Sequence, residues 1–263
     1  MKICLTLAAC LSCASAEDTE WLKITAEPAT WSDALVVANP RQAAFVLDSP
    51  AQTRLRGFVP ASPLARVFAE NEIRRQVADF FAILPRPDEV GLKIDWLDKD
   101  GRAAGFTRSI HPKHGRIRSV QRVGQTTITR TVIAAGDEAA IFIHFIADQP
   151  GALSFRVTLG GPPAAEARIE DRRQLILPAG ADHLAAHVWV LTFESDVASE
   201  GNSITVRGEG EALIVWNFAA GKTLDTTLAN LGARYDPGHL PPNPAKIWQG
   251  IQRTLGKSTE NSP

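Results

Sequence analysis

Hydrophobic and polar side chains alternate with a period of two along most of this 263-residue chain. In residues 153–159, the apolar side chains fall on one face of a strand and Ser, Arg and Thr fall on the other. Residues 92–96 and 212–218 repeat this pattern. Further strands are predicted at 43–48, 116–123, 126–134, 139–147, 168–177, 184–193 and 203–207.

Turn-forming residues separate these segments. Gly and Pro cluster at 123–125, 149–151, 160–163 and 179–181, between one alternating segment and the next. Many short strands divided by such turns are typical of antiparallel sheets that pack face to face. The sequence therefore predicts an all-β fold.

Two stretches depart from the alternation. Residues 64–82 have apolar positions at helical spacing, which predicts one helix crossing between strands before Pro85 ends it. Residues 247–255 predict a short amphipathic helix near the C-terminus, after a Pro-rich segment at 237–244.

The first residues are typical of a secretory leader. Lys2, the apolar run 3–11 and Ala14-Ser15-Ala16 predict a signal peptide over 1–16 and an exported bacterial protein, periplasmic or extracellular. Leu7 to Cys10 also resembles a lipobox, so lipidation at Cys10 is the alternative. No later segment has the ~18 consecutive apolar residues of a membrane-spanning helix. The expected divisions are 1–16, a β-sandwich domain over 17–225, and a helical and Pro-rich extension over 226–263.

Composition removes several classes of function. All three cysteines lie within 1–16, so the expected mature chain has no disulfide, thiol nucleophile or cysteine-bound metal. The formal net charge of −1 argues against nucleic acid or an anionic membrane as the main partner. We expect no cofactor and no metal site.

The histidines offer little chemistry. His111 and His114 are best interpreted as part of an exposed loop. His183 and His187 have the i, i+4 spacing of helical zinc ligands, but a strand would hold them roughly 13 Å apart, too far to share an ion. His144 lies in an apolar strand and is expected to be a hydrogen-bonded sheet residue.

Two clusters of acidic residues are candidates for metal binding or catalysis. Asp95, Asp98 and Asp100 surround Gly101, which suggests either a calcium loop or, as we favour, a hairpin turn. In the second group, Glu194, Asp196 and Glu200 could supply an acid and a base for glycoside hydrolysis. They are expected in a polar loop, where carboxylates also serve solubility, and we predict no catalytic residue.

The tryptophans fall into two sets. One set lies on alternating apolar faces and is expected in the core: Trp96, Trp189 and Trp216. The other set lies in less regular sequence and could pack in the core or stack on a sugar ring: Trp21, Trp31 and Trp248.

Three segments resemble the N-terminal domain of glycoside hydrolase family 95, the α-L-fucosidase family. Residues 31–46 are similar to its opening strand, and Asn39 and Arg41 fall on the family's Asn and Arg. Residues 97–102 resemble its Asp-rich hairpin, and 126–159 resemble its central strand pair. The resemblance covers roughly 21–225 and implies a large antiparallel β super-sandwich.

The same resemblance implies that the catalytic machinery lies elsewhere. In the family, the catalytic acid and most sugar contacts belong to a downstream α/α toroid, and only 38 residues follow Asp225. The family's glycines around Asn39 are replaced by Ala38 and Pro40, and the active-site loop has no counterpart after Leu55.

Three hypotheses follow. The first is an exported, non-catalytic module that binds carbohydrate or a partner glycosidase through Trp31, Asn39 and Arg41. The second is one component of a split or truncated α-L-fucosidase that acts on fucosylated glycans. The third is a degenerate fragment that retains only the structure.

Overall fold

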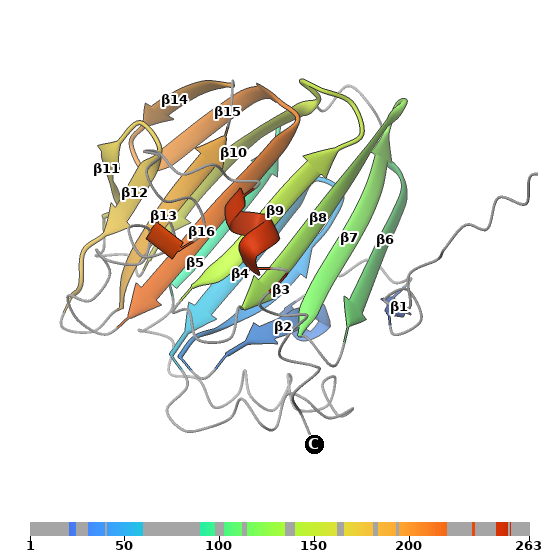
Figure 1. Cartoon of the computed structure of the whole chain (residues 1–263). Coiled ribbons are helices and arrows are strands. Elements are labelled where there is room, and N and C mark those ends of the chain that lie inside the picture. Colours follow the sequence, from blue (N-terminus) through green and yellow to red (C-terminus); the bar gives the residue numbers. More distant parts are fainter. Residues whose placement is uncertain are drawn as a thin grey trace, which may run out of the picture.

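The structure is a computed structural model with two antiparallel β-sheets packed face to face (Figure 1). It describes residues 21–24, 31–39, 41–59, 90–97, 103–111, 115–134, 140–161, 166–180, 184–192, 195–219, 233–234, 246–251 and 253. The predicted all-β class is therefore confirmed. The leader, the helix over 64–82 and the Pro-rich segment lie outside the described residues and stay predictions.

One sheet has nine strands in the order β1-β6-β7-β8-β9-β16-β13-β12-β11. Its strands are β1 Leu22–Ile24, β6 Ala103–His111, β7 Arg116–Val123, β8 Thr126–Ala134, β9 Ile141–Ala147, β11 Arg168–Asp171, β12 Gln174–Leu177, β13 Ala185–Thr192 and β16 Glu211–Ala219.

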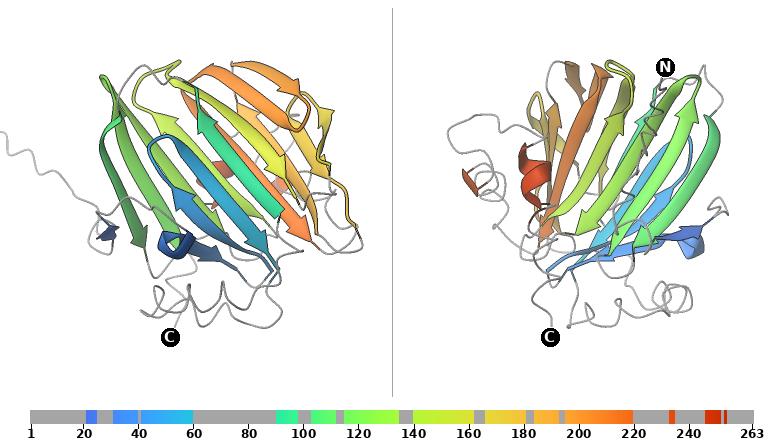
Figure 2. Two further views of the ribbon diagram at one scale, coloured as in Figure 1. Left: turned by 180° about the vertical axis from the view of Figure 1, so that it is seen from behind. Right: turned by 45° about the vertical axis from the view of Figure 1, so that its right-hand side comes forward.

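The second sheet has seven strands in the order β14-β15-β10-β5-β4-β3-β2. They are β2 Leu35–Ala38, β3 Ala43–Asp48, β4 Gln52–Phe58, β5 Val90–Trp96, β10 Leu153–Gly160, β14 Asp196–Glu200 and β15 Ser203–Glu209, and the short 3-10 helix η2, Trp31–Asp33, precedes β2. The view from behind shows this sheet as the front layer (Figure 2, left).

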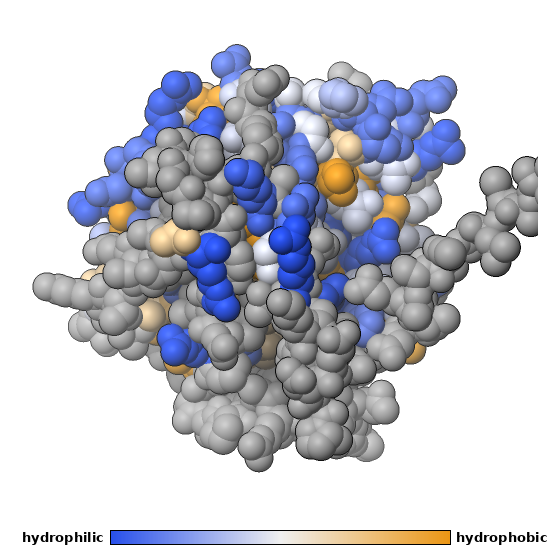
Figure 3. Space-filling view, in the orientation of Figure 1, coloured by the Kyte–Doolittle hydropathy of each residue, from blue (hydrophilic) through white to orange (hydrophobic). Residues whose placement is uncertain are grey.

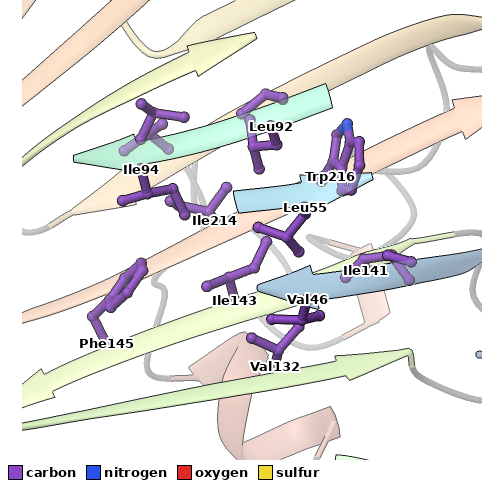
Figure 4. Close-up of a cluster of buried hydrophobic side chains, with 14 of the residues drawn as sticks. Val46, Leu55, Leu92, Ile94, Val132, Ile141, Ile143, Phe145, Ile214 and Trp216 are labelled. Atoms are coloured by element: carbon purple, nitrogen blue, oxygen red, sulfur yellow. The ribbon is translucent and has the colours of Figure 1, made fainter. Parts of the chain in front are cut away.

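The main core lies between the two sheets. The inward side chains of 153–159 and 212–218, predicted from the alternation, are all fully buried there. Figure 4 shows Leu55, Leu92 and Ile94 of the seven-stranded sheet meeting Ile143 and Ile214 of the other. Burial of apolar surface at ~25 cal/mol per Å² is the main force that holds such layers together.

A second apolar cluster covers the outer face of the nine-stranded sheet. Residues 246–251 are helical, which confirms this part of the predicted C-terminal helix. Ile247, Trp248 and Ile251 pack on apolar side chains of β8, β9, β13 and β16. The exposed positions of the helix are polar. The described residues visible on this side are mainly hydrophilic, with small separate hydrophobic patches (Figure 3).

The structure corrects three predictions of local structure. The Asp-Gly segment after Asp95 does not join a hairpin, because β5 and β6 belong to different sheets and the chain crosses between layers there. Segment 168–177 is two strands, since the Asp171 carboxylate accepts the backbone N–H of Arg173 and turns the chain. Residues 196–200 form edge strand β14 rather than a loop. Their single inward apolar residue, Val197, gave too weak an alternation to be recognised.

Among the described residues, no helix has the length and apolar character needed to cross a bilayer.

Candidate functional site

The most concentrated group of charged and polar side chains lies inside the sandwich. The guanidinium of Arg130, on β8, donates from Nη1 to Asp48 Oδ1 at 2.6 Å and from Nη2 to Gln121 Oε1 at 2.9 Å. Thr53 and Ser119 donate their hydroxyls to the same Asp48 carboxylate. The network therefore joins β3 and β4 of one sheet to β7 and β8 of the other.

This interior network is closed to any ligand. The side chains of Arg130 and Asp48 are 1% and 2% exposed, and the guanidinium lies between the rings of Trp96 and Phe106. Burial lowers the pKa of Arg130, and the charge and hydrogen bond of Asp48 oppose that shift. We conclude that the network fixes how the two sheets pack.

The histidines are also engaged in packing. His144 Nε2 lies 2.8 Å from Glu211 Oε1, and its ring stacks on Trp248 at 4.4 Å between centroids. His187 lies in β13, as predicted, and contacts Gln174 and Trp189. His111 is buried against the edge of Trp21, so the expectation of an exposed loop is wrong for this residue; β6 continues through it. His114 and His183 lie outside the described residues.

Of the carboxylate candidates, Asp98, Asp100 and Glu194 lie outside the described residues, and the others form no pair suited to catalysis. Asp196 and Glu200 are exposed on β14 four residues apart, a separation of ~13 Å along a strand, whereas glycosidase carboxyl groups lie about 5–10 Å apart. Asp95 forms an ion pair with Lys93 at 2.9 Å. Within the described parts of the chain, no group of three His, Cys, Asp or Glu side chains is placed to hold a metal ion.

The tryptophans divide as the sequence indicated. The set predicted for the core is buried, Trp189 beneath the C-terminal helix and the others between the sheets. Trp248 is buried as well, by the stack with His144. Trp21 and Trp31 remain partly exposed, so these two have surface available to a ligand.

Trp31 is at the centre of a surface cluster that we name the Trp31 cluster: Trp31, Arg54 and Arg56. The guanidinium carbon of Arg56 lies over the indole at 4.3 Å and that of Arg54 at 5.5 Å. The indole also packs against the apolar outer side of β2, β3 and β4, which fixes its position. A Trp ring is the strongest cation–π acceptor among the side chains, so it holds both guanidiniums on the outer face of the seven-stranded sheet.

Asn39 and Arg41 lie at the other end of β2, in the turn that leads to β3. Asn39 Oδ1 accepts the backbone N–H groups of Arg41 and Gln42, both at 2.8 Å, and the residue is buried. Gln42 in turn donates its amide to Asn217 Oδ1 of the opposite sheet at 2.6 Å. Asn39 thus shapes the turn, while Arg41 is exposed on it.

The structure therefore places Trp31 at one end of β2 and Asn39 and Arg41 at the other, and it adds two residues that the sequence analysis missed. Arg54 and Arg56 alternate with the buried Thr53, Leu55 and Gly57 in β4. That Arg-Leu-Arg alternation was a readable signal for a strand with a basic outer face.

No protein-family model matches the sequence, and no curated protein matches it. Among solved structures, the chain is similar to a putative kojibiose phosphorylase from human microbiome, with 10% sequence identity and a TM-score of 0.35. The match covers 64% of this chain and 28% of that one, so this chain spans about a quarter of the length of that neighbour.

Proposed function

We propose that this protein is an exported, non-catalytic β-sandwich module that binds carbohydrate or a partner glycosidase through the surface around β2. The observation that carries the proposal is the Trp31 cluster, in which a partly exposed indole and two guanidiniums are fixed together on a sheet face. Aromatic rings and planar cations are the side chains that most often anchor ligands at protein surfaces. Arg41, exposed at the other end of β2 in the turn that Asn39 shapes, is the further residue proposed for this binding.

The resemblance of 31–46 and 126–159 to the N-terminal domain of α-L-fucosidases supports a role in carbohydrate metabolism. A split or truncated α-L-fucosidase is the alternative that this resemblance offers. The wide separation of Asp196 and Glu200 on β14 argues against that pair as its acid and base.

A glycan array with the purified chain tests the binding function. Trp31→Ala should abolish binding, whereas Trp21→Ala should leave it intact. Trp21 is the matched control, because it is also partly exposed and also carries an arginine, Arg118, 6.0 Å from its ring, but lies at the edge of the other sheet. Glycan binding that is unchanged in Trp31→Ala would show that the binding site is not on this surface.

The enzyme alternative makes a separate prediction. This prediction is the release of fucose from fucosylated glycans, by the purified chain or by the chain mixed with a catalytic partner. Such release would show that the chain is a hydrolase component rather than a binding module.

Fractionation of the producing cells tests export. Export requires that the protein be found in the periplasm or medium with residues 1–16 removed.

A further inference from the structure

The outer face of the seven-stranded sheet is rich in positive charge. On the three central strands β4, β5 and β10, the outward side chains include four cations, Arg54, Arg56, Lys93 and Arg156, and one carboxylate, Asp95. The whole chain carries a formal charge of −1, so this excess is local. We use the term basic face for these five side chains together with Gly91 and Gly160 on the same side of the sheet.

The register of the strands sets out the basic face in rows. Arg56 lies opposite Gly91, which lies opposite Gly160, so one row has a cation followed by two positions without side chains. Neighbouring strands are ~4.8 Å apart, and the two glycines therefore open a floor two strands wide. In the next row, Arg54 lies opposite Lys93, which lies opposite Thr158.

The glycine floor has no explanation in the packing of the described chain. A Cβ added to Gly91 or Gly160 would come no closer than 3.9 Å to any described atom outside its chain neighbours, and neither residue has a positive φ. Glycine weakens a strand, and its use inside one often marks a close approach by a ligand. Both residues are partly exposed.

Hydroxyl groups border the floor. Thr158 Oγ1 and Ser203 Oγ are 3.0 Å apart, and Arg156 Nε donates to Thr205 Oγ1 at 3.4 Å. Seen from behind, β4, β5, β10 and β15 form the front layer, and the C-terminal helix lies behind them (Figure 2, left). Cations, hydroxyls and an open backbone floor are suited to a flat, polar, negatively charged ligand.

We infer that the basic face binds an acidic polysaccharide, with sugar rings over Gly91 and Gly160 and their acidic groups paired with Arg54, Lys93 and Arg156. This inference rests on the proposed carbohydrate function and specifies its ligand class. Charge complementarity selects this ligand, because Arg54 and Lys93 are like charges directly opposite across strands and repel each other. Asp95, which pairs with Lys93 at 2.9 Å and lies opposite Arg156, is the one carboxylate set against the four cations of this face. The indole of Trp31 keeps Arg56 directed toward the β2 side of the face.

Binding of three polymers to the full chain, measured by affinity electrophoresis, tests the inference. A polyuronate supplies carboxylates, a sulfated glycan supplies sulfates, and dextran is the neutral polymer. At least one acidic polymer should bind more than ten-fold more tightly than dextran, and the affinity should fall as NaCl is raised from about 50 to 500 mM because salt screens exposed charges. The two acidic polymers show which anion is preferred.

Variants locate the binding. Lys93→Gln with Arg156→Gln should weaken acidic-polymer binding at least ten-fold, and Gly91→Ala with Gly160→Ala should weaken it while the melting temperature stays within a few degrees. Arg168→Gln removes one exposed cation from β11 of the other sheet and should have no effect.

The outcomes separate this inference from the proposed function. Dextran binding equal to that of the acidic polymers, and sensitive to Trp31→Ala, overturns the acidic ligand and leaves the carbohydrate module standing. Acidic-polymer binding that is unchanged in the Lys93 and Arg156 double variant moves the site off the basic face. Absence of binding to all three polymers and to a glycan array overturns both.

Discussion

Arg130 and Asp48 form an ion pair of 2.6 Å across the interior of the sandwich, although they come from different sheets. Removing one member of a buried pair leaves the other charge without compensation, which typically costs ~3–5 kcal/mol. Asp48→Asn should therefore lower the free energy of unfolding by about that amount, as measured by urea denaturation. A loss below ~1 kcal/mol would show that Arg130 finds another partner.

The double variant Asp48→Leu, Arg130→Met should be measured in the same way and compared with Asp48→Asn. Replacement of a buried ion pair by apolar side chains of similar volume is often neutral or stabilising. Here Gln121, Thr53 and Ser119 would lose partners as well. We expect the double variant to be more stable than Asp48→Asn alone and less stable than the wild type.

Two glycines on neighbouring strands should respond in opposite ways to the same substitution. A Cβ on Gly57 would lie 2.6 Å from the Phe218 ring and 2.8 Å from the Trp216 ring, both buried. Gly57→Ala should therefore destabilise the fold by ~1–3 kcal/mol through overpacking. A Cβ on Gly91 would meet backbone oxygens at an ordinary contact distance of 3.9 Å, so Gly91→Ala should change stability by less than ~0.5 kcal/mol. Equal melting temperatures of the two variants would contradict this difference.

Trp248 should anchor the C-terminal helix. It is 6% exposed, stacks on His144 and packs in the apolar cluster on the outer face of the nine-stranded sheet. Trp248→Ala should lower the free energy of unfolding by ~3–5 kcal/mol, because it removes a large buried side chain. In this variant, limited proteolysis should cut the chain near 246–251. Gln249→Ala, at an exposed position of the same helix, is the control and should behave as wild type.

Asn39 should act on stability rather than directly on a ligand. Its side-chain oxygen satisfies two backbone N–H groups of a buried turn, and each unsatisfied group costs ~1–3 kcal/mol. Asn39→Ala should lower the melting temperature, whereas Asn39→Asp, which keeps the acceptor, should largely preserve it. Arg41→Ala should leave the melting temperature unchanged and reduce glycan binding, in contrast to Asn39→Ala, which lowers the melting temperature.

The alternation located most of the strands but missed β4 and β6, and it was insufficient for strand pairing. Strands 116–123 and 126–134 were located from alternation alone, because each buries most of one face. The hairpin expected after Asp95 was wrong because strand pairing depends on contacts far apart in the chain, and a local Asp-Gly signal does not report them. Short strands such as β2 and β14 carry too few residues for a period of two to be visible.

The polar sites show the same limit. Arg130 has the inward parity of Ile128 and Val132, so the alternation could have identified a buried cation, but its partner Asp48 is more than eighty positions earlier. Trp31 was identified as a candidate, whereas its contact with Arg54 and Arg56 required the register of β2, β3 and β4.

The placement of β16 has a consequence for how the protein is made. This strand, the last among the described residues, lies between β9 and β13 at the middle of the nine-stranded sheet. The strands on its two sides cannot be joined until the ribosome has produced residue 219, so earlier segments must wait with unpaired edges.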